Sequence, residues 1–525
     1  MYQIYPRSFY DTNNDGIGDL PGIIKKLDYL NDGTEKSLGV EAIWLSPIYR
    51  SPQVDFGYDV ANYNDIDPIF GTLSDFDRLV EEAHARGMKV IMDFVPNHTS
   101  IEHPWFAESR ASKDSVKRDW YIWRDPKPNG GPPNNWLSVF GGPAWELDKQ
   151  TGQYYLHSFF REQPDLNWRN EEVRKEMLNV LEFWLHRGVD GFRTDSIHHL
   201  TKDSKFRDDP PNPNYKPGNS DPYDALLHIH SLGYDEPLDN INAMCEILGL
   251  HDNKFLVSEA YLDIPEMTRL YGACQNNLHA PFNFNLMTMP WSALKFREFI
   301  DKFETSLLQD DWPTYVMGNH DRLRIATRLG QSRAKLIAML LLTLRGMPLI
   351  YYGDELGMEC VDISPEKILD PFEKNVPGMN FGRDPERTPM QWSGATHAGF
   401  SKRNPWLPVE KEFKKRNVTG ESRSSKSTFN LYRKLIWFRK SSKALLRGKY
   451  QSFDCGNQDI FSYKRTVEDE EVTVFLNFSG QDQKLNYALA GVKLVCNTDS
   501  ETRANEDFKS AELILKPYEG YVFTV

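Results

Sequence analysis

Eight short apolar runs, most of them separated by longer amphipathic stretches, are the feature of this 525-residue chain that most limits its fold. Stretches such as 73–86 and 171–187 repeat apolar residues at helical spacing. Alternating strands and helices predict a parallel sheet. Eight units with nearly continuous apolar strands, and no GxGxxG after any of them, favour a closed (β/α)8 barrel over an open doubly wound sheet. The predicted strands are 3–5, 42–45, 90–95, 190–193, 255–257, 281–285, 314–317 and 349–352.

Two stretches interrupt this alternation. Residues 97–167 shift to Trp, Pro, Gly and Asn, a composition too irregular for one helix and too aromatic for disorder. They predict a subdomain inserted after the third strand, between barrel segments 1–96 and 168–446. The second interruption, 354–416, is a long loop rich in Pro, Gly and Asp after the eighth strand. Ordered loops of this length usually form walls or lids of a functional site.

The last part of the chain has a different pattern. From about Arg447 onward, apolar and polar residues alternate with a period of two. This pattern predicts a small antiparallel β-domain at 447–525, joined to the barrel by a helix at 431–441. The clearest alternating stretches are 459–465, 471–478, 492–497 and 511–525.

Charge and hydropathy exclude two classes of partner. The net charge is −13, and no basic stripe is interleaved with aromatic residues, so we expect no nucleic acid partner. No apolar run approaches the roughly 18 residues of a membrane span, so we expect no membrane partner. The longest run, 334–344, is typical of a buried barrel helix.

Five cysteines, an odd number without paired spacing, predict free thiols in a reducing compartment. The chain opens directly on its first predicted strand, which leaves no room for a signal peptide. We therefore expect a cytoplasmic protein, unless the native N-terminus lies upstream of residue 1.

Three carboxylates far apart in the chain, Asp195, Glu259 and Asp321, each follow a predicted strand. In a barrel these strand ends meet at one face, where active sites lie. A single acid at such a position is more often a helix cap or an ion-pair partner. Three carboxylates together, beside other polar residues, favour a catalytic site. Cleavage of a glycosidic bond needs one carboxyl group as proton donor and another as an anion near the anomeric carbon.

Several motifs give this chain a resemblance to the α-amylase clan of glycoside hydrolases (family 13), and more closely to its α-glucosidase and oligo-1,6-glucosidase branch. They stand in the family's order over residues 2 to about 445, whereas the C-terminal region matches only loosely. The motifs are DFVPNH (93–98), QPDLN (163–167), GFRTD (191–195), SEA (258–260), GNHD (318–321), LRGMPLIYYGDELGM (344–358) and RTPMQW (387–392).

The resemblance implies a division of roles among the carboxylates. Asp195 would be the nucleophile, Glu259 the general acid/base, and Asp321 a third carboxylate that orients sugar hydroxyls and stabilises the transition state. We expect Arg193, two residues before Asp195, to lower the pKa of that carboxyl. Glu259 has no adjacent basic residue, so we expect desolvation to raise its pKa. A separation of about 5–5.5 Å between nucleophile and acid would give a retaining mechanism.

The resemblance also implies an enclosed pocket for a terminal glucose. Asp55 would bind a hydroxyl, Tyr58 would stack on the ring, and Arg387 would pair with Asp55. The alternative is a purely structural role, in which Tyr58 is a core residue and Arg387 is part of a surface ion pair. An enclosed non-reducing end means that one glucose is removed at a time. Further residues expected around this sugar are His98, Phe159, Gln163, Arg193 and His320.

The segment DTNNDGIGD (11–19) has the pattern of a cation-binding loop. Oxygen ligands stand at alternate positions around a Gly-assisted turn, as in an EF-hand loop without its distant Glu. Spacing alone leaves open a metal-free Asx-rich turn. Relatives bind Ca²⁺ or Mg²⁺ at this motif, so we expect a structural ion and no organic cofactor. The expected ligands are Asp11, Asn13, Asp15, the Ile17 carbonyl and Asp19.

Ser196, directly after Asp195, is the best indicator of linkage. Relatives that prefer α-1,6 bonds typically carry Val at this position, so Ser196 favours α-1,4 bonds. We expect His198 and His199 to face the second glucose. The insert 202–224 is expected to wall the acceptor site, which would favour transfer of glucose to alcohols or sugars.

These features predict a retaining, exo-acting α-glucosidase that acts on maltose and short oligosaccharides as a monomer or homodimer. Two alternatives are enzymes: an α-1,6-acting oligo-glucosidase, and a transglucosidase or sucrose-active relative. A third is a catalytically inactive relative that serves as a transporter subunit. It is disfavoured because all three carboxylates are present and no membrane helix is predicted.

Overall fold

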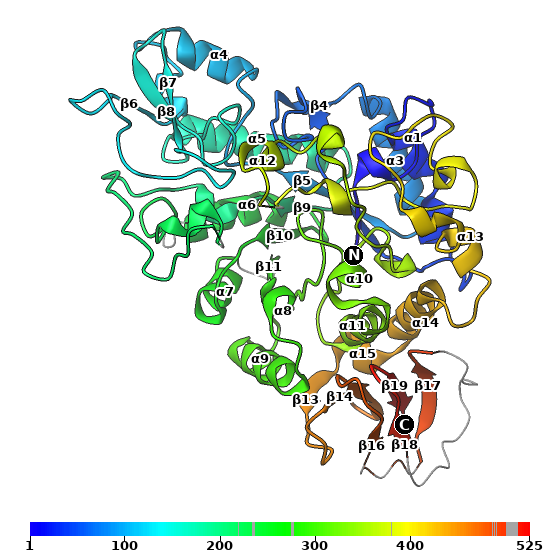
Figure 1. Cartoon of the computed structure of the whole chain (residues 1–525). Helices are drawn as coiled ribbons and strands as arrows, with labels where there is room; N and C mark the ends of the chain where they lie inside the picture. Colours follow the sequence, from blue (N-terminus) through cyan, green and yellow to red (C-terminus); the bar gives the residue numbers. More distant parts are fainter. Residues whose placement is uncertain are drawn as a thin grey trace.

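The computed structural model describes residues 1–218, 220–233, 237–274, 278–379, 381–485, 487, 489, 491–499 and 513–525. The predicted (β/α)8 barrel class is confirmed: barrel strands form one parallel sheet in the order β11-β10-β9-β5-β2-β1-β12. Figure 1 shows four of them, β5, β9, β10 and β11, next to one another. These strands are β1 (Tyr2–Ile4), β2 (Ala42–Leu45), β5 (Lys89–Phe94), β9 (Gly191–Thr194), β10 (Phe255–Glu259), β11 (His279–Phe282) and β12 (Ile350–Tyr351).

The predicted strand at 314–317 is wrong as a regular strand. It contributes one parallel bridge, between Tyr315 and Asn283. The Asn283 N–H donates to the Thr314 carbonyl at 2.8 Å, and the Met347 N–H donates to the Pro313 carbonyl at 2.9 Å. Pro313 has no N–H to donate, which limits the hydrogen-bond ladder at the start of this segment. At this segment the barrel is closed by a few hydrogen bonds instead of a continuous ladder between strands.

Helices cover the barrel as the sequence pattern predicts. A capping box formed by Thr72 and Asp75 starts α3 (Leu73–Ala85), and the Asn170 side chain caps α5 (Glu171–His186). The other helices of the barrel and its C-terminal junction are α1 (Leu20–Lys25), α2 (Leu27–Leu30), α6 (Pro237–Gly249), α7 (Ile264–Tyr271), α8 (Asn285–Thr288), α9 (Ala293–Ser306), α10 (Ile325–Leu329), α11 (Gln331–Thr343), α14 (Thr428–Ser441) and α15 (Lys443–Arg447).

The apolar helix α11 is buried because the C-terminal β-domain covers its outer side. Gly520 of that domain lies so close that a Cβ there would meet the Met339 Sδ at 2.6 Å and Leu336 at 3.1 Å. The Thr343 hydroxyl also hydrogen-bonds that of Tyr463, a residue of the β-domain. These contacts explain how residues 336–343 of this helix are buried on all sides.

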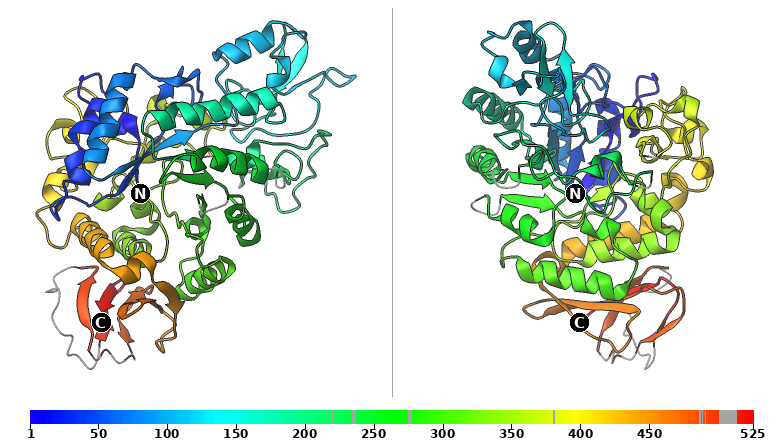
Figure 2. Two further views of the ribbon diagram at one scale, coloured as in Figure 1. Left: turned by 180° about the vertical axis from the view of Figure 1, so that it is seen from behind. Right: turned by 60° about the vertical axis from the view of Figure 1, so that its left-hand side comes forward.

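Residues between β5 and α5 form a separate layer beside the barrel. It holds α4 (Pro104–Ala111) and an antiparallel sheet of β6 (Trp123–Arg124), β8 (Gln153–Leu156) and β7 (Trp145–Asp148). A small aromatic core around Trp136 and Trp145 stabilises it. This layer projects from the barrel at the end opposite the C-terminal domain (Figure 2). A hairpin of β3 (Tyr49–Arg50) and β4 (Asn62–Ile66) precedes α3, and the long loop after β12 contains α12 (Pro371–Asn375) and leads to α13 (Val418–Glu421).

The expected C-terminal antiparallel β-domain is confirmed. One sheet has the order β13-β14-β15-β19-β17, and β16 pairs with β18. Residues 511–512, the start of the last predicted alternating stretch, lie outside the described residues. The strands are β13 (Lys449–Ser452), β14 (Ile460–Val467), β15 (Glu470–Asn477), β16 (Gln483–Leu485), β17 (Lys493–Asn497), β18 (Leu513–Leu515) and β19 (Gly520–Thr524).

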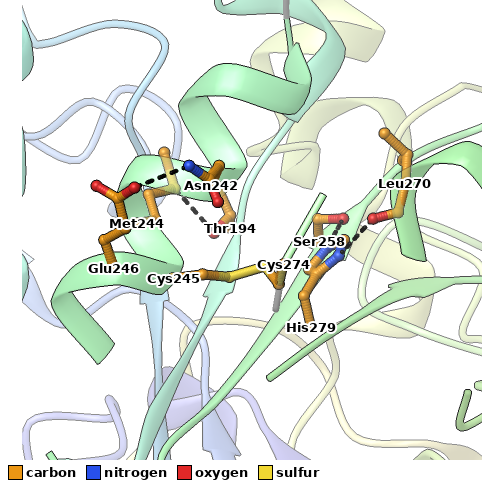
Figure 3. Close-up of a disulfide and its surroundings, with 9 residues drawn as sticks. All are labelled: Thr194, Asn242, Met244, Cys245, Glu246, Ser258, Leu270, Cys274 and His279. Atoms are coloured by element: carbon orange, nitrogen blue, oxygen red, sulfur yellow. Dashed lines mark hydrogen bonds between the residues drawn. A yellow bond between two sulfur atoms is a disulfide. The ribbon is translucent and has the colours of Figure 1, made fainter. Parts of the chain in front are cut away.

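The expectation that all five cysteines are free thiols is wrong for two of them. Cys245 on α6 and Cys274, which follows α7, form a disulfide with a Cα–Cα distance of 5.9 Å (Figure 3). They are 29 residues apart in sequence. Their spacing gave no signal because the pairing depends on how the chain folds back beside β10. The argument from cysteine usage for a reducing compartment therefore loses its basis.

The remaining cysteines, Cys360, Cys455 and Cys496, are free. Within the described ranges, no helix is long and apolar enough to cross a membrane.

Candidate active site

Arg193, on β9, brings two of the three predicted carboxylates together. Its Nη1 donates to Asp195 Oδ1 at 2.7 Å, and its Nη2 donates to Glu259 Oε2 at 2.5 Å. Asp195 follows β9 and Glu259 ends the neighbouring strand β10, so parallel pairing of these strands aligns the two acids. Asp195 is only 7% exposed and Glu259 only 6%. Two carboxylates on one guanidinium, at the carboxyl ends of barrel strands, can act on the same bond.

The contact with Arg193 corrects the expectation that Glu259 has no basic neighbour. The sequence places no cation next to Glu259, but the register pairs Arg193 with Val257 and Thr194 with Ser258. The Arg193 side chain thus reaches across to the adjacent strand. Because one guanidinium contacts both acids, Arg193 does not distinguish a nucleophile from a proton donor.

A third carboxylate, Asp93 at the end of β5, also accepts from Arg193 Nη1, at 2.7 Å. Burial raises the pKa of Asp93 to about 6, although Arg193 works against the shift. Burial likewise raises the pKa of Asp195 well above its ordinary value. Arg193 lowers the Asp195 pKa, as expected, but desolvation by burial outweighs that effect, so the expectation of a depressed pKa is wrong. At Asp93 and Asp195, burial therefore disfavours the ionised carboxylate and the Arg193 guanidinium favours it.

Asp321 has the opposite electrostatic environment. Burial alone would raise its pKa, but the His320 ring and the guanidinium groups of Arg387 and Arg383 lower it well below the ordinary value. Arg387 Nη2 donates to Asp321 Oδ1 at 2.8 Å. Asp321 is therefore ionised across the neutral range.

Tyr58 and His320 form one wall beside these acids. Their rings are stacked with centroids 5.4 Å apart and planes 2° apart, and the Tyr58 hydroxyl lies 2.7 Å from His320 Nε2. The same hydroxyl donates to Asp93 Oδ2 at 3.0 Å. His320 in turn contacts Asp321, with Nε2 to Oδ2 at 3.2 Å. The structure thus joins Tyr58 and His320 to the carboxylates by a continuous polar network.

A second group of predicted residues meets around Gln163. Its Nε2 donates to Asp55 Oδ2 at 3.1 Å and lies 3.0 Å from His98 Nε2. The Phe159 ring is 5.1 Å from that of His98. Asp55, His98, Phe159 and Gln163 are therefore neighbours, although as many as 108 residues separate Asp55 from Gln163.

The predicted partner of Asp55 is wrong. Asp55 pairs with Arg383, whose Nη2 lies 2.7 Å from its Oδ1, whereas Arg387 contacts Asp321 and the His320 carbonyl. Arg383 is itself held by Asp370, at 2.9 Å from both Nε and Nη2. Arg383 and Asp370 were missed because the path of the long loop decides which arginine reaches Asp55. The only signal was the position of Arg383, four residues before Arg387 in the same segment.

The residues after Asp195 lie next to this second group of residues. Ser196 adopts the left-handed backbone conformation, with φ 45° and ψ 46°. The ring of His199 lies 5.0 Å from that of Phe159. The Nδ1 atoms of His198 and His199 are buried and have no hydrogen-bond partner among the residues that the structure describes. His199 therefore lies beside Phe159, and its contact with a second sugar stays a prediction.

The insert 202–224 packs against the layer between β5 and α5. The Trp136 indole N–H donates to the Arg207 carbonyl at 2.9 Å. Asn219 of this insert lies outside the described residues. Its expected role as a wall of the acceptor site stays a prediction.

The loop 11–19 forms a hydrogen-bonded turn. Asp11 accepts from the Gly16 N–H at 2.9 Å, Asp15 accepts from the Ile17 N–H at 2.8 Å, and Asp19 caps α1. Oxygen donors of this kind suit Ca²⁺ or Mg²⁺. In the part of the chain that the structure describes, however, no three His, Cys, Asp or Glu side chains are gathered to hold a metal. The predicted ligands also include the Asn13 side chain and the Ile17 carbonyl, so the donor chemistry fits the ion and the ion stays a prediction.

Comparisons with known proteins find similar chains over the whole length of this one. The catalytic domain of α-amylases matches residues 3–448. The oligo-1,6-glucosidase of Heyndrickxia coagulans is 38% identical over 100% of this chain and 98% of its own length. Maltase 1 of Drosophila virilis is 39% identical over 99% of this chain and 85% of its own length. The crystal structure of the α-glucosyl transfer enzyme XgtA has a TM-score of 0.91 at 36% identity, covering 100% of this chain and 98% of that one.

Proposed function

Because this chain belongs to the α-amylase family of glycoside hydrolases, we propose that it is an exo-acting α-glucosidase that releases glucose from the non-reducing ends of short oligosaccharides. Relatives named α-glucosidase, maltase and oligo-1,6-glucosidase support this activity. The observation that carries the proposal is the pair Asp195 and Glu259 on one buried guanidinium, with the polar network of Tyr58, His320 and Asp321 beside them.

The mechanism we propose is retaining. An Asp195 oxygen attacks the anomeric carbon while Glu259 gives its proton to the leaving oxygen, so that the glycosidic bond breaks and a glucosyl ester forms. Glu259, now ionised, then takes a proton from a water molecule, which attacks the same carbon and releases Asp195. Contact of both acids with Arg193 supports the short carboxylate separation of retaining enzymes, about 5–5.5 Å.

The exo mode of action is supported by the Asp55–Arg383–Asp370 ion cluster. Arg383 is only 6% exposed and bridges two carboxylates. Breaking such a buried pair leaves an uncompensated charge and costs about 3–5 kcal/mol, so the cluster is a fixed wall. A fixed polar wall beyond the terminal glucose leaves no path for a longer chain on that side.

We propose a preference for α-1,4 bonds, with α-1,6 activity as the alternative. The preference rests on Ser196, and relatives include both a maltase and an oligo-1,6-glucosidase. Ser196→Val should raise the ratio of isomaltose to maltose kcat/KM by about 5-fold or more, because a branched side chain narrows the space beside Asp195. One kcal/mol of discrimination corresponds to about this factor. Ser196→Ala is the matched control, and an equal ratio in all three proteins would contradict the assignment.

The test of the function is incubation with maltose, isomaltose, sucrose and trehalose, followed by NMR of the first glucose released. We expect maltose to be hydrolysed fastest. Sucrose contains a single glucose unit, so the anomer first released from it reports the stereochemistry, and we expect α-glucose. Initial release of β-glucose from sucrose would refute retention, and no activity on any of the four sugars would refute the α-glucosidase proposal.

Transfer of glucose to a second sugar is a further candidate activity. It is supported by the likeness to XgtA, which is named an α-glucosyl transfer enzyme. Product analysis at high maltose concentration separates the two activities, because a transferase accumulates trisaccharides whereas a hydrolase accumulates glucose.

We also propose that loop 11–19 binds Ca²⁺ as a structural ion. Binding to the folded state alone would raise the free energy of unfolding by about 2.7 kcal/mol at 100 times Kd. Thermal unfolding should therefore shift upward on addition of CaCl₂ to chelator-treated protein, and Asp15→Ala should remove the shift. Identical melting temperatures with and without Ca²⁺ would contradict the proposal.

A further inference from the structure

Gln3, on β1, carries a buried amide that contacts the imidazole ring of His320. Gln3 is 0% exposed, and a buried amide is costly unless it is hydrogen-bonded. Its Nε2 donates to Ser46 Oγ at 3.2 Å and lies 2.8 Å from His320 Nδ1. These two contacts can use both N–H groups of the amide. Gln3 is therefore joined to the polar network beside the predicted catalytic acids.

The His320 ring is packed in one place and is neutral. It stacks on the Tyr5 ring, with centroids 5.9 Å apart, as well as on Tyr58, and lies edge-on to Trp44 at 6.0 Å. Burial lowers the pKa of His320 well below its ordinary value, although the charge of Asp321 opposes the shift. A neutral imidazole has one N–H donor and one acceptor nitrogen. Packing thus fixes the ring but leaves open which nitrogen carries the proton.

The neighbours of His320 Nε2 decide where the proton lies. This nitrogen is 2.7 Å from Tyr58 Oη and 3.2 Å from Asp321 Oδ2. The Tyr58 hydroxyl donates its own proton to Asp93 Oδ2 at 3.0 Å, so its oxygen is the acceptor toward His320. An ionised carboxylate such as that of Asp321 only accepts. Both neighbours therefore require a proton on Nε2, and Nδ1 then presents a lone pair to Gln3.

We propose that Gln3 is a positioning residue, which holds His320 in the tautomer that carries its proton on Nε2. This inference rests on the proposed α-glucosidase function, because Nε2–H then points to Tyr58 and Asp321, two residues predicted to act on the terminal glucose. With the proton on Nδ1, the Nε2 lone pair would face the Asp321 carboxylate and repel it. The alternative is the opposite amide orientation, in which the Gln3 oxygen accepts from an Nδ1–H.

The tautomer itself is the first measurement. Protein labelled with [¹⁵N]histidine gives long-range ¹H–¹⁵N correlation spectra that distinguish a protonated ring nitrogen from a bare one. The His320 signal is assigned by its loss in His320→Gln. We expect the Nε2–H form in the parent protein without any sugar present. A His320 signal of the Nδ1–H form would overturn the proposal.

Two replacements of Gln3 separate hydrogen bonding from the filling of space. Gln3→Met has a similar length but no donor, and should lower kcat/KM for maltose by about 10-fold, as expected for one lost hydrogen bond in a buried site. Gln3→Glu keeps the shape, but its carboxyl donates to Nδ1 only while it is protonated. Between about pH 5 and pH 9, where buried Glu side chains ionise, its kcat/KM relative to the parent should therefore fall as the pH rises. The fall should reach about 10²-fold, less than the roughly 10⁴-fold that a wrong His tautomer costs in a Ser-His-Asp triad.

Gln391→Met is the matched control. Gln391 is also 0% exposed, but its Nε2 donates to Glu410 Oε2 at 2.8 Å instead of to a ring nitrogen. This variant should keep the kcat/KM, the pH profile and the His320 tautomer of the parent, even where it lowers the unfolding temperature. Should Gln3→Met fail to fold, Ser46→Ala releases the second N–H of the Gln3 amide and provides a milder comparison.

The outcomes separate this inference from the function on which it rests. A constant ratio of Gln3→Glu to parent activity at every pH, with an unchanged His320 signal, would assign Gln3 to packing alone and leave the α-glucosidase proposal intact. A parent protein that cleaves none of the four sugars but shows the Nε2–H form would refute the function, while the effect of Gln3 on the tautomer would still be read from the spectra of its variants.

Discussion

Replacement of Asp195 by Asn is expected to lower kcat/KM for maltose by at least about 10⁴-fold, the order of loss seen when a catalytic nucleophile is removed. An amide has nearly the same shape as the carboxylate and still accepts from Arg193, which lies 2.7 Å from Asp195 Oδ1. It does not form the glucosyl ester. The measurement is the initial rate of glucose release, together with the thermal unfolding temperature of each protein.

The stability of this variant is expected to stay the same or to increase. Asp93, Asp195 and Glu259 share one guanidinium, so removing one negative charge relieves repulsion among the remaining acids. Asp190→Asn is a matched control, because Asp190 is a buried acid that pairs with Lys89 and His84 outside the site. That control should lose stability and keep activity. Residual activity above about 1% in Asp195→Asn, compared with the expected loss, would refute the nucleophile assignment.

The barrel and the three carboxylates were predictable because their signals are local. Each acid follows a short apolar run, and parallel strands bring their carboxyl ends to one face. The segment 314–317 failed as a regular strand for a local reason too, since Pro313 has no N–H to donate. Its position next to β11 was nevertheless correct.

The pairings within the site were not predictable, because they depend on strand register and on the path of a long loop. Register places Glu259 beside Arg193, although they are 66 residues apart. The loop after β12 decides that Arg383, and not Arg387, reaches Asp55. The disulfide between Cys245 and Cys274 likewise depends on how the chain folds back beside β10. Motifs thus identified which residues meet, whereas their partners required the folded chain.

Replacement of Glu259 by Gln is expected to lower kcat/KM for maltose by about 10²–10⁴-fold, the usual contribution of general acid catalysis. With α-D-glucosyl fluoride the bond-cleaving step should be much less affected, because fluoride leaves without first accepting a proton. The burst of fluoride release should therefore persist, and hydrolysis of the glucosyl enzyme should become the slow step. An equal loss of activity on maltose and on the fluoride would contradict the assignment of Glu259 as the proton donor.

Adding azide to variants of the two acids tests which acid is the nucleophile and which is the proton donor. This test is needed because Arg193 contacts both acids, so electrostatics alone does not separate their roles. In Glu259→Ala, azide needs no general base and should attack the glucosyl ester, giving α-glucosyl azide with overall retention. In Asp195→Ala, azide should occupy the space of the lost carboxylate and attack the substrate directly, giving β-glucosyl azide. Exchange of the two products between the variants would reverse the assigned roles. The same configuration from both would exclude a retaining pair, since only one of the two reactions passes through a covalent intermediate.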